Sequence, residues 1–420
     1  MANYYPRLIE KTIERKLRTS GAILVSGPKY SGKTTTCSLF AKSKIALIDD
    51  DLITMVAADP KIALEGETPR LIDEWQTIPN LWNLIRKEVD DRSAFGQFIL
   101  AGSATPSDSK KRHHSGAGRI TEIKMRPMSL FESQDSKGSV SLKSLFDEEN
   151  YSFFDMNEGF SLKDIAFYLC RGGWPTTIVP NREDALDITK NYYDGLFNFR
   201  ASSNPSLRKK RPEILKAILR SYARNVSSEA SQSLMMEDLK SKGINLDEKT
   251  FRSYLNTASD LFLIEDVEAW TPELRSKTAI RTAPTRHFVD PSIACRSLYA
   301  SPNDLLNDPS SFGFLFEDLV VRDLRIYAES LGGKLLHYRD KSGLEIDSIV
   351  HLDDGRWGAI EIKLGSPEGI QEGAEHLLKL DKILAPTFKR PSFKMVLTAV
   401  GKAHRLENGV YVCPINLLRN

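Results

Sequence analysis

The first 130 or so residues alternate short apolar runs with stretches of helical periodicity, which is the pattern of a wound α/β domain. The apolar runs are predicted to be strands at residues 22–26, 45–48, 70–72 and 97–101. A stretch rich in serine and charge, residues 133–150, follows and has little periodicity. It is predicted to be a surface insertion or a linker.

The region between residues 162 and 299 has apolar positions mostly at helical spacing. Within it, residues 235–243 and 247–270 follow the order helix, glycine turn, helix and strand. This order is typical of a helix-turn-helix or winged-helix module. We therefore expect the middle region to be helical and winged-helix-like.

The last region has the pattern of a small mixed α/β unit. An amphipathic stretch at 312–333 is predicted to be a helix that ends at a glycine pair. Two strands, a helix and a third strand are predicted to follow it, at residues 345–352, 357–365, 374–383 and 394–400. Together the patterns predict an α/β protein of three domains, at residues 1–160, 161–310 and 311–420.

Composition narrows the classes of protein to which the chain can belong. Its 420 residues are 41% hydrophobic and 27% charged, as in ordinary globular proteins. With 58 basic and 56 acidic residues the net charge is only +2, which excludes a uniformly basic surface for nucleic acid. The 4 cysteines are too far apart for zinc-ligand spacing or a dense disulfide framework, so we expect a reducing cytoplasm. No run approaches the roughly 18 to 20 apolar residues of a membrane span, and the charged N-terminus lacks the core of a secretory signal.

A phosphate-binding motif lies between the first predicted strand and the helical stretch that follows it. Residues 27–34 match the pattern G-x4-G-K-[ST]. Its glycines allow backbone N–H groups to face phosphates, its lysine contacts the β- and γ-phosphates, and its threonine hydroxyl ligates Mg²⁺. The motif therefore predicts binding of ATP and Mg²⁺ by Gly27, Pro28, Lys29, Tyr30, Ser31, Gly32, Lys33, Thr34 and the adjacent Thr35.

Further polar residues follow two of the other predicted strands. Asp73 and Glu74 end the strand at 70–72, as in a Walker B element, so Asp73 is expected to hold Mg²⁺ and Glu74 to polarise the attacking water. Ser103, or alternatively Thr105, follows the strand at 97–101 and is expected to contact the γ-phosphate or the water. The shared location is the carboxyl edge of the sheet, where open parallel sheets bind ligands.

The segments GPKYSGKTT, LIDEWQ, FILAGSATP, SGAGRI and RPMSLFE, in this order, resemble the AAA+ ATPases of bacteria and archaea that carry a C-terminal domain of unknown function. The resemblance implies a homo-oligomeric ring, in which an arginine of one subunit neutralises charge on the phosphoryl group bound by its neighbour. Arg119 is the best match for this arginine and Arg112 the next, the alternative being that Arg119 pairs within its own subunit. Family members usually have arginine where this chain has Lys29, which preserves the charge but not the bidentate geometry.

The middle region contains further basic residues, each of which has two possible roles. Arg171, in the glycine-containing segment 169–175, either faces the nucleotide or belongs to a helix C-cap with a packed Trp174. A basic run at 208–211 and the later residues Arg275, Lys277, Arg281 and Arg286 either bind the phosphates of DNA or form solvated faces.

The last region contains a loose acidic motif that resembles the D…ExK signature of restriction-endonuclease-like proteins. Asp347 lies on one predicted strand, Glu361 and Lys363 share a face of the next, and Glu317 lies on the preceding helix. Two carboxylates would hold a second divalent ion that activates water, with Lys363 as a further electrophile. The alternative is a degenerate domain for nucleic-acid binding or assembly, because residues 311–420 have 15 basic and 15 acidic side chains and hence no net field for a polyanion.

Three functions are consistent with these motifs. The first is a Mg²⁺-dependent ATPase that couples hydrolysis to a nucleic-acid transaction. The second is an ATP-gated nuclease that uses the acidic motif of the last region. The third is a nucleotide-dependent switch that recruits a protein partner and has no nucleic-acid substrate.

Overall fold

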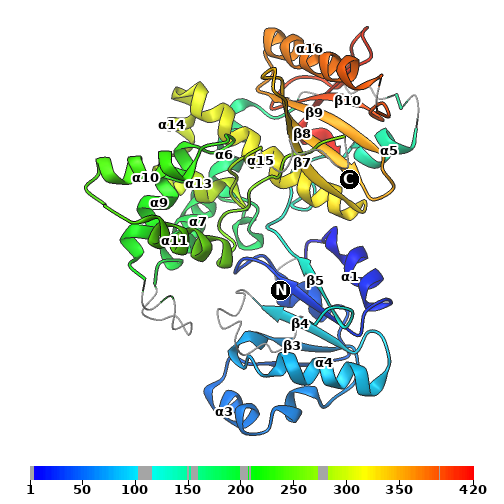
Figure 1. Ribbon diagram of the computed structural model, residues 1–420, viewed down its shortest axis with the longest axis vertical. Coiled ribbons are helices and arrows are strands. Elements are labelled where there is room, and N and C mark those ends of the chain that lie inside the picture. Colours follow the sequence, from blue (N-terminus) through cyan, green and yellow to red (C-terminus); the bar gives the residue numbers. More distant parts are fainter. Residues whose placement is uncertain are drawn as a thin grey trace. The chain divides into compact units, whose positions relative to one another are not determined.

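A computed structural model describes residues 4–102, 116–148, 151–152, 159–198, 207, 210–272, 282–386 and 388–420. These residues form two compact units (Figure 1). Unit 1 comprises the described residues of Met1–Pro127, Phe197–Arg211 and Asn256–Leu263, and unit 2 those of Met128–Leu196, Pro212–Leu255 and Ile264–Asn420. Among the described residues, no helix combines the length and the apolar character that crossing a membrane requires.

Unit 1 contains a five-stranded parallel sheet of order β2-β3-β4-β1-β5. The strands are β1 (Ala22–Ser26), β2 (Ser43–Ala46), β3 (Arg70–Asp73), β4 (Phe98–Gly102) and β5 (Ile120–Lys124). Every residue of the three inner strands is buried, which explains why they appear in the sequence as continuous apolar runs. The four predicted strands are confirmed, with β2 starting two residues earlier than expected. The edge strand β5 was not predicted, because its exposed and polar positions give no such run.

Helices cover both faces of this sheet. They are α1 (Ile9–Leu17), α2 (Lys33–Ser38), α3 (Asp50–Ala58) and α4 (Leu81–Arg92). Alternate residues of β1 face opposite sides: Ile23 packs with Ile13 of α1, whereas Leu24 packs in a second core with Trp82 of α4. The wound α/β architecture expected from the sequence is therefore confirmed for unit 1.

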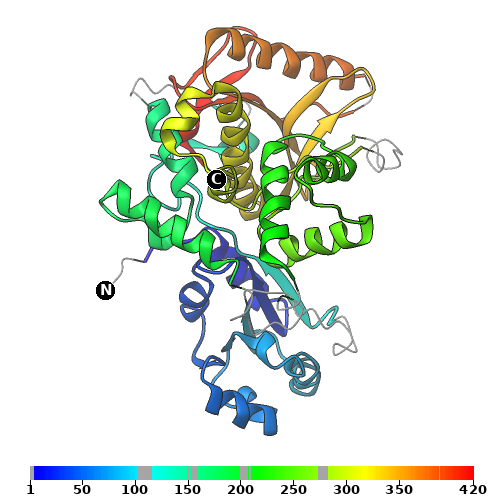
Figure 2. The ribbon, with the colours of Figure 1, turned by 90° about the vertical axis from the view of Figure 1, so that its left-hand side faces the viewer.

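Unit 2 contains a six-stranded mixed sheet of order β11-β12-β10-β9-β8-β7. Its strands are β7 (Gly333–Arg339), β8 (Glu345–Leu352), β9 (Trp357–Lys363), β10 (Lys394–Thr398), β11 (His404–Arg405) and β12 (Tyr411–Pro414). The sheet contacts the helices α15 (Pro309–Ser330) and α16 (Pro367–Leu384) (Figures 1 and 2). Its core includes Trp357, Ile349 and Leu377. The mixed α/β pattern predicted for the last region is confirmed.

The remainder of unit 2 is mostly helical. Its helices include α6 (Leu162–Arg171), α7 (Arg182–Gly195), α9 (Pro212–Arg224), α10 (Gln232–Ser241), α13 (Pro291–Leu298) and α14 (Pro302–Asn307). The helix α11 (Glu248–Asp260) belongs to unit 2 up to Leu255 and to unit 1 from Asn256 onward. A turn at Gly243, whose φ is +75°, separates α10 from α11. After α11 the chain forms antiparallel bridges between Ile264 and Phe288 and between Val267 and Thr285. The predicted order of helix, turn, helix and extended chain is present, and its nucleic-acid-binding role stays a prediction.

The segment at 133–150 is not a linker over its described residues, contrary to the prediction. It forms β6 (Val140–Ser141) and α5 (Leu142–Asp147), and β6 pairs with β13 (Leu418–Arg419) near the C-terminus. Ser136 is buried and donates hydrogen bonds to two carbonyl oxygens of the C-terminal segment, each at 2.9 Å. The prediction was wrong because Ser136 is hydrogen-bonded to backbone carbonyl groups inside the protein and not to water. The chain consequently enters unit 2 at Met128, well before the boundary expected at residue 160.

Candidate functional site

The phosphate loop joins β1 to α2 in unit 1, as the motif predicts. Three of its residues have positive φ: Gly27 at +152°, Tyr30 at +64° and Gly32 at +93°. A side chain at Gly27 would bring its Cβ within 2.0 Å of the backbone oxygen of Met125, so only glycine fits there. The backbone is therefore wound as tightly as a loop that surrounds phosphate groups requires.

Lys33, the lysine of the motif, is buried at the start of α2. Its Nζ donates to the backbone oxygens of Gly27 at 3.0 Å and Pro28 at 2.6 Å. Burial lowers the pKa of Lys33 to about 8, although the nearby carboxylates of Glu74 and Asp73 act in the opposite direction. The ammonium group thus lies inside the loop and is still mostly protonated at neutral pH, as a phosphate-binding lysine needs to be.

The structure brings together the two residues that the sequence predicts as Mg²⁺ ligands. Asp73 is buried at the end of β3, and its Oδ2 accepts a hydrogen bond of 2.9 Å from the hydroxyl of Thr34. Hydroxyl and carboxylate oxygens are ligands that Mg²⁺ accepts, and Mg²⁺ takes its remaining ligands from phosphates and water. The pair therefore fits a Mg²⁺ ion bound with a nucleotide.

Glu74 leaves the strand immediately after Asp73. Its φ of +53° is left-handed, which ends β3 and agrees with the expected position of this carboxylate at the edge of the sheet. The Nε2 of Gln76 donates to its Oε2 at 2.5 Å. The sequence reasoning missed Gln76, although the segment LIDEWQ contains it two residues after the acidic pair.

The strand β4 ends at Gly102, beside the side chains of Gln76 and Trp75. A Cβ at Gly102 would lie 2.4 Å from Oε1 of Gln76 and 3.0 Å from Nε1 of Trp75. Both of these polar atoms are buried and have no hydrogen-bond partner among the described residues. The γ-phosphate contact expected of Ser103, with the alternative Thr105, lies outside the described residues. Arg112, the second match for a ring arginine, lies outside them as well.

Arg119 pairs within its own chain in the structure. Its Nε donates to Oδ1 of Asp90 on α4 at 2.8 Å, and 45% of the Arg119 side chain is exposed. An exposed ion pair of this kind contributes about 0.2 to 1 kcal/mol, so it is easily exchanged for another partner. The structure thus shows the intrasubunit alternative, and action on a neighbouring subunit stays a prediction.

The basic residues of the middle region are largely engaged in unit 2 or lie outside the described chain. Arg171 is buried, forms an ion pair of 2.6 Å with Asp135, and precedes Gly172, which caps α6 with a φ of +73°. Trp174 is buried too, so the structure supports the C-cap interpretation of this segment. Arg286 forms an ion pair with Asp266. Five basic residues for which phosphate binding or a solvated face was expected lie outside the described residues: Arg208, Lys209, Arg275, Lys277 and Arg281.

The four residues of the acidic motif in unit 2 converge. The carboxylate of Asp347 on β8 accepts a bond of 2.7 Å from the backbone N–H of Ile362, and Nζ of Lys363 lies 3.5 Å from Oε2 of Glu361. Burial raises the pKa of Glu361 to about 9, with the charge of Asp347 adding to the effect. Burial also raises the pKa of Glu317 well above its usual range, followed by repulsion from Asp347 and Glu361.

Convergence of these carboxyl groups does not by itself form a metal centre. In the part of the chain that the structure describes, no group of three or more histidine, cysteine, aspartate or glutamate side chains could hold a metal ion. The Thr34 and Asp73 pair in unit 1 is a different kind of site, because it has two residues and one of them is a threonine. The acidic site of unit 2 is therefore a cluster of carboxyl groups with raised pKa values beside a lysine.

Comparisons with known proteins agree with the geometry of unit 1. Residues 19–134 match the model of an AAA domain, and residues 162–304 and 312–418 match two domains of unknown function, DUF8612 and DUF4143. The uncharacterized proteins Mb2031c of Mycobacterium bovis and Rv2008c of Mycobacterium tuberculosis are each 23% identical over 370 residues, which is 87% of this chain and 75% of theirs.

A solved structure, the Walker-type ATPase of Pyrococcus abyssi, is 15% identical and covers 70% of this chain and 96% of its own, with a TM-score of 0.43. A likeness this low carries no argument about the fold. The match to the AAA model spans the phosphate loop, Asp73 and Glu74. Residues 19–134 are thus an AAA-type P-loop ATPase domain.

Proposed function

We propose that this protein is a cytoplasmic, Mg²⁺-dependent ATPase that couples ATP hydrolysis to a nucleic-acid transaction. The observation that carries the ATPase part is the hydrogen bond between Thr34 and Asp73 beside the buried ammonium group of Lys33. A positive charge, a hydroxyl and a carboxylate at the end of a glycine-containing loop are what a nucleoside triphosphate and its Mg²⁺ need.

Each side chain has a defined role in this proposal. Lys33 leaves the carbonyl oxygens of Gly27 and Pro28 and contacts the β- and γ-phosphates, while Thr34 and Asp73 hold Mg²⁺. When bound, Mg²⁺ neutralises charge on the phosphates. Glu74 accepts a hydrogen bond from the attacking water and takes its proton as the new bond to the γ-phosphorus forms, while the bond from that phosphorus to the bridging oxygen breaks and ADP leaves.

Two further groups complete the proposed site. Ser103, which follows β4 in the sequence, has the proposed role of contacting the γ-phosphate. Arg119 exchanges Asp90 for the transferred phosphoryl group of a neighbouring subunit in a homo-oligomeric ring, where a guanidinium stabilises the charge of the transition state. A mixing experiment tests the ring: inactive Glu74→Gln subunits, which keep Arg119, should restore turnover to Arg119→Ala subunits. Failure to restore turnover in mixed oligomers would contradict action on a neighbouring subunit.

The nucleic-acid part rests on unit 2. The order of α10, the Gly243 turn, α11 and the antiparallel bridges is that of a helix-turn-helix followed by paired extended chain. The test is ATP turnover measured with and without single- and double-stranded DNA over a range of salt concentrations. Stimulation that falls steeply with salt supports contacts to phosphates. Turnover that ignores DNA, together with a protein partner whose binding follows the nucleotide state, would favour a protein-recruiting switch instead.

A second candidate function is ATP-gated, metal-dependent cleavage of nucleic acid by unit 2. It is favoured by the convergence of Glu317, Asp347, Glu361 and Lys363. As the described residues lie, the carboxyl groups are not arranged as a metal centre, so a divalent cation would have to draw them together, and it would then offset the repulsion among them. Scoring strand cleavage in the same turnover assay tests it. Cleavage that requires Mg²⁺ or Mn²⁺ and is lost in Asp347→Ala, with ATP turnover preserved, is the expected result.

A further inference from the structure

A buried arginine near the N-terminus of unit 1 joins the phosphate loop to the chain that leaves β5. Arg7 is only 6% exposed and precedes α1. Its Nη1 donates to the backbone oxygen of Ser31 in the phosphate loop, and its Nη2 donates to the backbone oxygen of Arg126, both at 2.7 Å. The planar guanidinium offers several donors in a rigid fork, so it holds the two backbone segments at a defined separation.

The chain that leaves β5, residues 125–130, is called the strap here. Its first residue contacts the start of the phosphate loop directly. The N–H of Met125 donates to the oxygen of Ser26 at 2.7 Å, and the backbone oxygen of Met125 occupies the space that a Cβ at Gly27 would need. Within unit 1 the strap is therefore attached to both the beginning and the middle of the phosphate loop.

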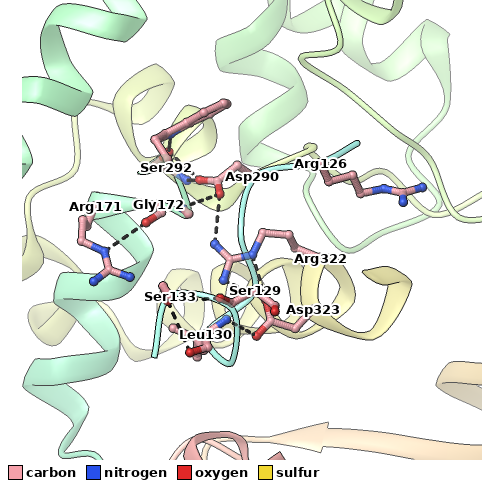
Figure 3. Close-up of polar contacts among 12 residues, drawn as sticks. Arg126, Ser129, Leu130, Ser133, Arg171, Gly172, Asp290, Ser292, Arg322 and Asp323 are labelled. Atoms are coloured by element: carbon pink, nitrogen blue, oxygen red, sulfur yellow. Dashed lines mark hydrogen bonds and ion pairs between the residues drawn. The ribbon is translucent and has the colours of Figure 1, made fainter. Parts of the chain in front are cut away.

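The other end of the strap is hydrogen-bonded within unit 2. The N–H of Met128 donates to the oxygen of Gly173 at 2.6 Å, and a Cβ at Gly173 would lie 2.0 Å from the oxygen of Met128. The N–H of Leu130 donates to Oδ2 of Asp323 at 2.9 Å, and Asp323 is paired with the buried Arg322 (Figure 3).

The partners that hold this end belong to a buried network. Arg322 also pairs with Asp290, whose Oδ2 accepts a bond from the N–H of Gly173. Arg322, Asp290 and Asp323 are each at most 1% exposed. Packed and hydrogen-bonded groups of this kind move between discrete arrangements and resist gradual deformation.

We propose that Arg7 is a positioning residue that couples nucleotide occupancy of the phosphate loop to the strap, and through the strap to unit 2. The coupling rests on the proposed ATP binding. Phosphate groups draw Lys33 away from the oxygens of Gly27 and Pro28. The conformation of the loop therefore changes at the points to which the strap is attached. Arg7 carries the change at Ser31 to Arg126. Because coupling is reciprocal, a perturbation at Gly173 must alter the affinity for nucleotide.

Hydrogen exchange of the strap tests the proposal. Peptides that cover residues 125–130 are followed in the full chain, with and without a saturating non-hydrolysable ATP analogue whose binding is measured separately. We expect the analogue to change exchange of the strap about fivefold or more in the wild type. In Arg7→Ala the response of the strap should be much smaller than in the wild type, because only the direct contact of Met125 with the start of the loop remains. The analogue should still bind, about tenfold more weakly, after loss of two charge-assisted bonds.

A matched control is available in the same unit. Arg70 is also buried, and it donates to the backbone oxygen of Ala63 at 2.7 Å and to Oγ of Ser43 at 3.0 Å, without a bond to the phosphate loop. Arg70→Ala should lower thermal stability but keep the response of the strap. Arg7→Lys makes at most one of the two bonds, so it should recover stability without recovering the response. Recovery of both in Arg7→Lys indicates a merely structural role and overturns the proposal.

A double-mutant cycle provides a second readout. Gly173→Ala should shift the dissociation constant of the analogue about fivefold in the wild-type background and by much less in the Arg7→Ala background. Equal shifts in both backgrounds overturn the proposal, as does a strap that responds in Arg7→Ala as it does in the wild type. If Gly173→Ala does not fold, the exchange experiment decides alone. A wild-type chain that binds no nucleotide refutes ATP binding itself, a result distinct from loss of coupling.

Discussion

Substitution of Gly27 by alanine is expected to abolish most nucleotide binding while leaving the chain folded. The new Cβ would lie 2.0 Å from the backbone oxygen of Met125, which is about 1.5 Å short of normal contact. Overpacking of this kind costs about 1 to 3 kcal/mol. A side chain at the φ of +152° adds about 1 to 3 kcal/mol of backbone strain. The oxygen cannot move away cheaply, because Met125 is bonded to Ser26 and Arg126 to Arg7.

The first residue of the phosphate loop must therefore shift. If this shift weakens the binding of ATP by about 2 kcal/mol, the affinity for ATP should fall by about 30-fold. Gly118→Ala is the control, because Gly118 also has a positive φ of +78° but no atom of the described residues lies within 4 Å of its Cβ position. Titration with a fluorescent ATP analogue and thermal melting measure the two effects. Unchanged affinity in Gly27→Ala, or an equal loss in Gly118→Ala, would refute the reasoning from close contact.

Three further changes have expected outcomes. Burial lowers the pKa of Lys33 from 10.5 to about 8, so ATP affinity measured by titration should fall as pH rises through 8. The stability of unit 1 without nucleotide should instead rise between pH 8 and 10.5, because in that range the unfolded chain binds a proton that the folded chain has lost. Because burial raises the pKa of Glu361 from 4.5 to about 9, wild-type stability should fall as pH rises across that window. Thermal melting of Glu361→Gln should show a shallower slope, with the raised pKa of Glu317 still contributing, and a melting temperature about 2 to 4 °C higher at pH 8. Arg322→Leu leaves Asp290 and Asp323 buried without their partner, so chemical denaturation should show a loss of about 3 to 5 kcal/mol, and a loss below 1 kcal/mol would contradict this assignment.

The geometry of the phosphate loop and the meeting of Thr34 with Asp73 could be predicted from the sequence, because the signals for them are local. The phosphate loop is a contiguous motif between a strand and a helix, and Asp73 and Glu74 directly follow a buried apolar run. Parallel strands bring such ends to one edge, so residues 39 positions apart, Thr34 and Asp73, could be expected to meet. The convergence of Asp347 with Glu361 was predictable for another reason, because the two residues lie on neighbouring strands, which pair antiparallel.

Contacts that depend on topology were not predictable. Arg7 reaches a loop 24 residues away and a strap 119 residues away, and nothing in its local sequence distinguishes it from a surface arginine. The serine-rich segment looked like a linker because composition cannot show that Ser136 bonds to a chain segment 280 residues later. Arg286 looked like a phosphate-binding residue for the same reason, since its partner Asp266 lies across an antiparallel pairing.

The central claim is that Glu74 activates water for attack on ATP held by Lys33, Thr34 and Asp73. It is tested most directly by phosphate release from ATP in the presence of Mg²⁺, compared between the wild type and Glu74→Gln, with ATP binding measured for both. Loss of a general base costs about 10² to 10⁴ in rate, so Glu74→Gln should bind ATP with near wild-type affinity and hydrolyse it at least about 100-fold more slowly. Turnover by Glu74→Gln at the wild-type rate would contradict the account.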